Sequence, residues 1–215
     1  MTAPVENAAE PGPMKVTIIS DYVCPWCYIA SERVDAFAAE FDVEIEWWPY
    51  ELHPETPAAG RHVDELIAPS SRAEASRSMI KDLAAAAGLP MQSNRWVANS
   101  RQALALAEFA RDQDKFEQVH HALFSAVFAE AKNIGDPNVL LEIAGNAGLD
   151  AALWQAESAE YSELVGRTTA IAREQGFTST PTMIFNEEMM VPGAQDLEVY
   201  RDVLQRLGAR RREAV

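Results

Sequence analysis

The chain's two cysteines, Cys24 and Cys27, enclose Pro25 and Trp26 and stand where a β-branched run gives way to a helical pattern. Thiol–disulfide exchange needs two thiols close enough to form a disulfide, one of them ionised at working pH. A helix N-terminus stabilises such a thiolate through its unpaired N–H groups and its dipole. The motif therefore predicts Cys24 as the exposed attacking thiolate and Cys27, one turn further on, as the buried resolving thiol.

A structural zinc site is the competing interpretation of a C-x-x-C motif, and it requires four ligands. The chain has no second C-x-x-C, and its histidines are His53, His62, His120 and His121. The last two are adjacent within a predicted helix, so their side chains point in different directions. The residues favour redox chemistry, and we expect no bound metal.

Composition and net charge argue against two classes of partner. The 215 residues are 48% hydrophobic, which is enough for a sizeable core, and 33 acidic against 18 basic residues give a net charge of −15. An acidic surface repels nucleic acid and anionic membranes, so neither is an expected partner. The first 13 residues lack Lys and Arg and do not resemble a secretory signal, and no run of about 18 apolar residues occurs. We expect a cytoplasmic protein.

Hydrophobic periodicity predicts an α/β fold with strand and helix segments in a definite order. Residues 14–20 and 43–47 read as strands on either side of a helix ending near residue 41. Residues 63–175 are helical almost throughout, and the last two helices of this block are expected at 150–156 and 161–175. Two strands, at 181–185 and 189–191, and a helix at 196–207 follow. Without the helical block, the βαβ and αββα halves have the order of a thioredoxin fold.

This order divides the chain into parts with different expected roles. We expect a thioredoxin-fold domain interrupted by a large all-helical insertion between its βαβ and αββα halves. The expected parts are a disordered lead-in at 1–13, the thioredoxin-fold domain at 14–60 and 161–208, the insertion at 61–160, and a basic C-terminal tail at 209–215.

The segment S-D-Y-V-C-P-W-C-Y-I resembles the signature of DsbA-family thioredoxin-fold proteins, in particular their FrnE-like branch. Further segments similar to that branch lie at 48–54, 133–140, 147–150 and 191–195, so the resemblance spans about residues 14–207. It implies a thioredoxin domain with a helical insertion and a DsbA-like disulfide oxidoreductase activity.

The resemblance also implies a cis-proline loop opposite the active-site helix, matched here by Ser179-Thr180-Pro181. Such a loop would leave the backbone of Thr180 free to pair with an extended substrate chain. The residues alone leave a second reading open, in which a trans Pro181 simply begins a strand.

Several other residues receive weaker assignments. Trp26 is a predicted substrate contact because aromatic side chains bury much area at low entropic cost. Tyr28 and His53 are candidates for the active-site groove. Three tryptophans and the Phe116–Phe128 stripe are expected in the core; the tryptophans are Trp47, Trp48 and Trp96.

The acidic residues nearest to the motif are Asp21 and Glu51. The strand before the motif carries no carboxylate, unlike that of thioredoxin and DsbA. We expect Asp21 to serve as a turn or cap residue and Glu51 to face solvent or bond a loop. The proton acceptor for Cys27 is therefore left unassigned.

Three functions are consistent with these features. The first is a thiol–disulfide oxidoreductase acting on protein or small-molecule disulfides, with no cofactor unless glutathione serves as redox partner. The second is a glutathione-dependent isomerase or transferase, similar to 2-hydroxychromene-2-carboxylate isomerase or kappa-class glutathione transferases, which does not need two cysteines. The third is a non-enzymatic binding module. The presence of Cys27 favours the first; the substrate, the direction of exchange and the oligomeric state stay open.

Overall fold

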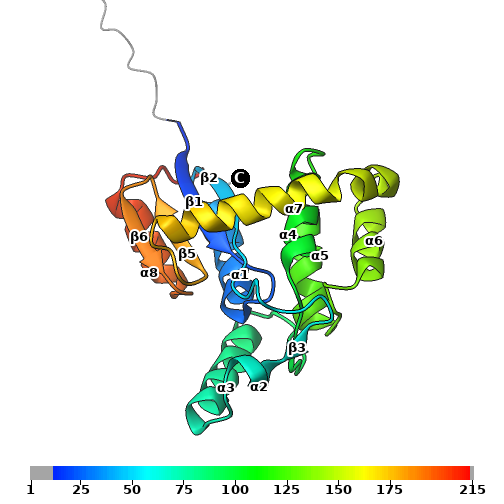
Figure 1. Ribbon diagram of the computed structural model, residues 1–215. Coiled ribbons are helices and arrows are strands. Elements are labelled where there is room, and N and C mark those ends of the chain that lie inside the picture. The colour runs from blue at the N-terminus through cyan, green and yellow to red at the C-terminus, as the bar shows by residue number, and fades with distance from the viewer. Residues whose placement is uncertain (1–11, 214–215) are drawn as a thin grey trace, which may run out of the picture.

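The computed structural model describes residues 12–213 and has a four-stranded mixed sheet in the order β2-β1-β5-β6 (Figure 1). Strand β1 (Met14–Ser20) pairs in parallel with β2 (Val43–Pro49) and antiparallel with β5 (Thr182–Phe185). Strand β6 (Met189–Pro192) pairs antiparallel with β5. These strands are the ones the periodicity predicted, and their order is that of a thioredoxin fold.

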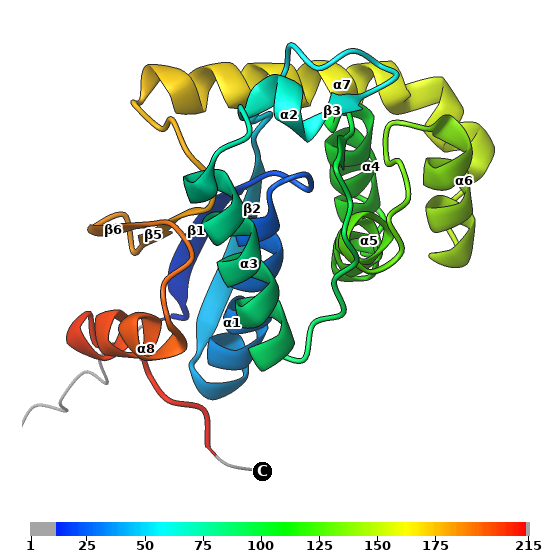
Figure 2. The ribbon, with the colours of Figure 1, turned by 90° about the horizontal axis from the view of Figure 1, so that it is seen from below.

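Helices cover both faces of this sheet (Figure 2). Helices α1 (Pro25–Glu40) and α8 (Leu197–Arg206) lie on one face, and α7 (Ala151–Glu174) crosses the other. Alternation along β1 explains the two layers, because successive side chains of a strand point to opposite faces. Ile18 packs in the cluster shared with α1 and α8, whereas Ile19 packs in the cluster that contains Ala172 of α7.

The remaining elements come between β2 and α7 in the sequence. They are β3 (Arg61–His62), α2 (Val63–Leu66), α3 (Ser71–Ala86), β4 (Trp96–Val97), α4 (Arg101–Arg111), α5 (Phe116–Phe124), a π-helix (Ser125–Ala129) and α6 (Pro137–Asn146). Helices α4, α5 and α6 stand together beside the sheet, and α3 lies against α1 (Figures 1 and 2).

The sequence predicted an all-helical insertion, and this prediction was wrong. Strands β3 and β4 form an antiparallel pair of two residues each. Strands this short show no alternating pattern, so periodicity could not reveal them. Trp96 lies in β4 and is 45% exposed, with its indole Nε1 donating to the Ala59 carbonyl at 3.1 Å. Its assignment to the core was therefore wrong.

Helix α7 is continuous, whereas two helices with a break before residue 161 were expected. The segment between them, Glu157–Glu160, consists of residues with adequate helix propensity, and nothing in it ends a helix. Asp150 caps the helix by accepting hydrogen bonds from the N–H groups of Ala152 and Leu153. The boundary expected at residues 160–161 falls inside this helix, which belongs both to the insertion and to the thioredoxin-like part.

The two ends of the chain differ in what the structure shows. The expected lead-in at 1–13 lies outside the described residues except for its last two. The expected basic tail runs back along the end of α1, where Arg212 donates from its backbone N–H to the Glu40 carbonyl at 2.8 Å. Among residues 12–213, no helix is long and apolar enough to cross a membrane.

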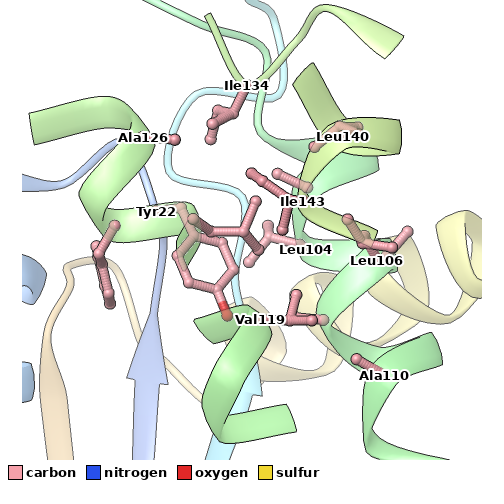
Figure 3. Close-up of a cluster of buried hydrophobic side chains, with 14 of the residues drawn as sticks. Tyr22, Leu104, Leu106, Ala110, Val119, Ala126, Ile134, Leu140 and Ile143 are labelled. Carbon is pink, nitrogen blue, oxygen red and sulfur yellow. The ribbon is translucent and has the colours of Figure 1, made fainter. Parts of the chain in front are cut away.

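The largest hydrophobic cluster lies mostly in the insertion (Figure 3). Tyr22, from the turn after β1, lies among Leu104 of α4, Val119 of α5 and Ile143 of α6. Cys24 and Cys27 belong to the same cluster. The insertion therefore packs directly against the segment that holds the two thiols.

Candidate active site

The two cysteines occupy the first turn of α1. Cys24 is the N-cap residue, in an extended conformation, and Pro25 is the first residue of the helix, where its missing N–H costs no hydrogen bond. The Cys24 carbonyl accepts hydrogen bonds from the backbone N–H groups of Cys27 and Tyr28, at 3.0 and 3.2 Å. The backbone N–H of Cys24 donates to the Asp21 carbonyl at 3.1 Å, which closes the turn after β1.

Both thiols are free and buried. Cys27 is fully buried, as predicted, but Cys24 is only 3% exposed, so the prediction of an exposed Cys24 was wrong. The reason is tertiary. The Cys24 thiol lies 3.5 Å from the Thr180 carbonyl, to which it donates, and the insertion cluster covers it from another side.

The surroundings of the two thiols make them electrostatically different. The pKa of Cys24 is lowered, chiefly by a hydrogen bond from the Cys27 thiol, with smaller contributions from the Thr180 side chain and the backbone N–H of Cys27, against the opposite effect of burial. The pKa of Cys27 is raised well above its ordinary value, first by burial and then by its proximity to Cys24. These opposite shifts favour a negative charge on Cys24 over one on Cys27.

The Thr180–Pro181 loop lies opposite the start of α1, where the resemblance placed it. The Thr180–Pro181 peptide bond is cis. The loop is held by hydrogen bonds on either side: Thr182 Oγ1 donates to the Ser179 carbonyl at 2.9 Å, and Gly193 N–H donates to the Pro181 carbonyl at 2.8 Å. The structure thus brings together Cys24, Cys27 and Thr180, which are far apart in sequence.

The weaker assignments have mixed outcomes. Trp26 is partly buried and packs against the insertion cluster and the small cluster that includes Ile80 of α3; its contact with substrate stays a prediction. Tyr28 is a core residue rather than part of a groove, since its hydroxyl donates to the Pro90 carbonyl at 3.0 Å and its ring stacks on Phe128. His53 contacts Glu55, with 3.4 Å between Nδ1 and Oε1.

Asp21 is fully buried beside the motif, which sequence reasoning did not predict. It does make the expected turn bond, with Val23 N–H at 3.2 Å, and its other oxygen accepts from Leu52 N–H at 2.7 Å. Burial raises the pKa of this carboxyl to about 6, and hydrogen bonds from Leu52, Ser100 and Val23 only partly oppose it. The local sequence could not predict this burial, because the partners Leu52 and Ser100 come from later segments.

Glu51 is also buried, although it was expected to face solvent or bond a loop. Its carboxylate forms an ion pair with Arg101 at the start of α4, and its backbone N–H donates to Thr169 Oγ1 of α7 at 3.0 Å. These partners lie in the insertion and in α7, so the signal was not available from the local sequence. Among residues 12–213, no group of three His, Cys, Asp or Glu side chains is placed to hold a metal ion.

Comparison with known proteins agrees with this geometry. The DSBA-like thioredoxin domain family matches residues 15–205, nearly the whole chain. The chain belongs to this family. Within the DSBA-like fold, the elements that carry Cys24, Cys27 and Pro181 are all part of the matched region.

Three solved structures illustrate the likeness. The probable DsbA oxidoreductase SCO1869 of Streptomyces coelicolor is 28% identical, with 94% of this chain and 93% of that chain covered and a TM-score of 0.81. A 2-hydroxychromene-2-carboxylate isomerase is 20% identical over 90% of this chain and 96% of its own, with a TM-score of 0.74. The cytosolic disulfide reductase DsbM of Pseudomonas aeruginosa is 16% identical over 90% and 100%, with a TM-score of 0.66. The last two share the fold.

Proposed function

We propose that the protein is a thiol–disulfide oxidoreductase that exchanges the dithiol and disulfide states of Cys24 and Cys27 with a protein or small-molecule partner. One observation carries the proposal. The two thiols start a helix opposite a cis-proline loop, and their environments give Cys24 the lower pKa and Cys27 the higher one.

The reaction follows from this asymmetry. The Cys24 thiolate attacks one sulfur of a substrate disulfide, and the other substrate sulfur leaves as a thiolate. Cys27 then loses its proton and attacks Cys24 Sγ, which releases the second substrate thiolate. The products are a Cys24–Cys27 disulfide and two substrate thiols, so two electrons pass to the substrate. In the reverse direction, or with glutathione as the reductant, two external thiols are oxidised and the dithiol is regenerated.

The burial of Cys24 adds one requirement to the first step. With only 3% of the residue exposed, a substrate sulfur reaches Sγ only when the groups that cover it move aside. The Thr180 carbonyl is one of those groups, and a substrate chain that binds along the loop would take over its contact with the thiol.

The alternative is a glutathione-dependent isomerase on the same fold, and the likeness to 2-hydroxychromene-2-carboxylate isomerase makes the architecture compatible with it. Such an enzyme needs one activated glutathione thiol and has no use for a resolving thiol. The presence of a second buried thiol, Cys27, in the same helical turn as Cys24 favours dithiol exchange.

Single cysteine substitutions test the proposal. We expect Cys24→Ser to abolish the reduction of a disulfide substrate. We expect Cys27→Ser to accumulate a mixed disulfide through Cys24, detected by intact-protein mass spectrometry. Equal rates of alkylation of the two single variants at neutral pH would contradict the assignment of Cys24 as the attacking thiol. Isomerase activity retained in Cys27→Ser would favour the alternative.

A further inference from the structure

The loop that follows β6, residues 193–195, contacts the cis-proline loop directly. Its first residue, Gly193, donates from its backbone N–H to the Pro181 carbonyl at 2.8 Å. Gly193 has a φ of +75°, a conformation that glycine adopts without steric cost. Because Thr180 and Pro181 are consecutive, a group that fixes residues 193–195 also helps to fix the residue that faces Cys24.

One tyrosine hydroxyl bridges the two ends of this loop. Tyr200 of α8 is fully buried, and its hydroxyl donates to the Gly193 carbonyl at 3.1 Å and accepts from the Gln195 N–H at 2.9 Å. A phenol hydroxyl can donate and accept at the same time. The Tyr200 ring packs near Phe37 of α1 and Phe185 of β5, with centroids 5.9 and 6.2 Å away. The hydrophobic core therefore fixes the position of the hydroxyl.

A buried arginine of α1 holds the same loop. Arg33 is 8% exposed, and its Nη1 donates to the Gln195 carbonyl, while its Nη2 lies 3.5 Å from the Asp196 carboxylate. The N–H and carbonyl groups of Gly193 and Gln195 thus all have partners, three of them supplied by Tyr200 and Arg33. Since the first turn of α1 holds the two thiols, Arg33 ties the loop to the helix of the cysteines.

Thr180 is the residue that this arrangement places against Cys24. Its carbonyl lies 3.5 Å from Cys24 Sγ, and within residues 12–213 its backbone N–H donates to no other group. An extended chain that adds to a backbone edge pairs with N–H and carbonyl groups of this kind. Such binding is tighter when the edge is already in place, because a loop that must be ordered on binding lowers the affinity.

We propose that Tyr200 and Arg33 are positioning residues that hold residues 193–195, and through Gly193 the Thr180–Pro181 loop, in place to bind the extended chain of a peptide disulfide beside Cys24. The inference rests on the proposed function and names its substrate class, which is a disulfide carried by a polypeptide chain. Neither side chain takes part in the sulfur chemistry.

Two probes with the same reacting disulfide separate chain binding from chemistry. One is free cysteine joined by a disulfide to thionitrobenzoate, and the other is a soluble, extended peptide with that modified cysteine at its centre. The Cys24 thiolate attacks the cysteine sulfur of either probe, and the S–S bond breaks to release the coloured thionitrobenzoate thiolate. Cys27 then loses its proton and closes on Cys24, which releases the cysteine or peptide thiolate. Stopped-flow absorbance over a range of probe concentrations gives the half-saturating concentration and the maximal rate.

Tyr200→Phe keeps the ring in the core and removes only the hydroxyl. We expect it to raise the half-saturating concentration of the peptide about three- to tenfold, with the maximal rate unchanged. Its reaction with the cysteine probe should match that of the wild type. Arg33→Met should act in the same direction. The double variant should lose less than the product of the two single losses, because both residues act on one loop.

Tyr161→Phe is the matched control. The Tyr161 hydroxyl donates to the Asp112 carboxylate at 2.7 Å, which joins α7 to the end of α4 rather than to residues 193–195. This variant should react with both probes as the wild type does.

Three outcomes would overturn the inference. The first is a wild-type half-saturating concentration of the peptide in Tyr200→Phe. The second is an equal loss with both probes, which indicates a general structural effect. The third is a wild type that reacts with both probes at the same half-saturating concentration, in which case the proposed function stands without the inference. A wild type that releases no thionitrobenzoate from either probe contradicts the proposed function as well. Should Arg33→Met not fold, Tyr200→Phe decides alone.

Discussion

At the scale of single residues, the site depends on how burial acts on ionisable groups. Cys24 and Cys27 are both buried, yet their pKa values move in opposite directions because hydrogen bonds favour the charge on Cys24 and burial dominates at Cys27. Asp21 is buried beside them with a raised pKa of about 6. The first turn of α1 therefore lies among groups whose pKa values are shifted from their ordinary values by burial and hydrogen bonds.

Asp21 should make the stability of the protein depend on pH. Its pKa is about 6 in the folded protein against 3.8 ordinarily, so the folded state binds this proton more tightly than the unfolded state. The stabilisation is present below about pH 4 and is lost as the pH rises through about 6, an effect of about 3 kcal/mol. We expect Asp21→Asn to remove this loss, as measured by urea unfolding between pH 4 and 7.

A surface substitution of the same chemistry is the control for that measurement. Asp202 lies on the exposed side of α8, where it pairs with Arg206, and Asp202→Asn should retain the pH dependence of the wild type. Parallel curves for the wild type and Asp21→Asn over this range would show that the carboxyl of Asp21 does not titrate as stated.

At the scale of elements, polar N-cap residues mark where two of the helices begin. Asp136 and Asp150 cap α6 and α7 by accepting hydrogen bonds from backbone N–H groups of the first turn. Pro137 follows Asp136 at the first helical position, where its missing N–H costs no hydrogen bond. Caps act locally, which is why the start of α7 at residue 150 could be located without any knowledge of the fold.

The cap of α7 lends itself to a measurement. Asp150 accepts from two N–H groups, at 2.9 and 3.1 Å, and Asp150→Ala should lower the free energy of unfolding by about 1 kcal/mol. Lys115 occupies the same position before α5 but makes no side-chain cap, so Lys115→Ala should change the free energy by much less. Thermal or denaturant unfolding of the two variants gives the comparison, and similar losses in both would refute the role of the cap.

At the scale of the whole molecule, buried polar contacts join the insertion to the thioredoxin-like part. Arg101, at the start of α4, pairs with the buried Glu51 after β2, and its guanidinium also donates to the Ser162 carbonyl of α7 at 3.3 Å. Tyr22 extends from the cysteine segment into the insertion cluster (Figure 3). The insertion is therefore part of the wall of the site.

Loss of one partner of the Glu51–Arg101 pair should be costly. Arg101→Met leaves a buried carboxylate without its counter-charge, and we expect the free energy of unfolding to fall by about 3–5 kcal/mol. The double variant Glu51→Gln with Arg101→Met removes both charges and should recover part of this loss. A double variant less stable than Arg101→Met alone would contradict the argument. Denaturant unfolding of the wild type, Glu51→Gln, Arg101→Met and the double variant completes the cycle.

Features that depend on neighbours along the chain could be predicted from the sequence. They include the strand before the motif, the helix that begins at Pro25, and the order of strands and helices that identifies a thioredoxin fold. Periodicity, caps and proline act over one or two turns, so their signals are complete in a short segment. The place of both cysteines at the start of a helix also follows from these local signals.

The surroundings of those residues depend on contacts between distant segments of the folded chain. The burial of Cys24 depends on Thr180, which is 156 residues away, and the Tyr22–His120 contact joins residues 98 apart. Glu51 is buried because the insertion brings Arg101 to it. Burial and pairing depend on contacts between segments that meet only when the chain folds. The sequence of one segment does not indicate which distant segment will contact it. For this reason the position of the motif at a helix start could be predicted, whereas the groups that set its charges could not.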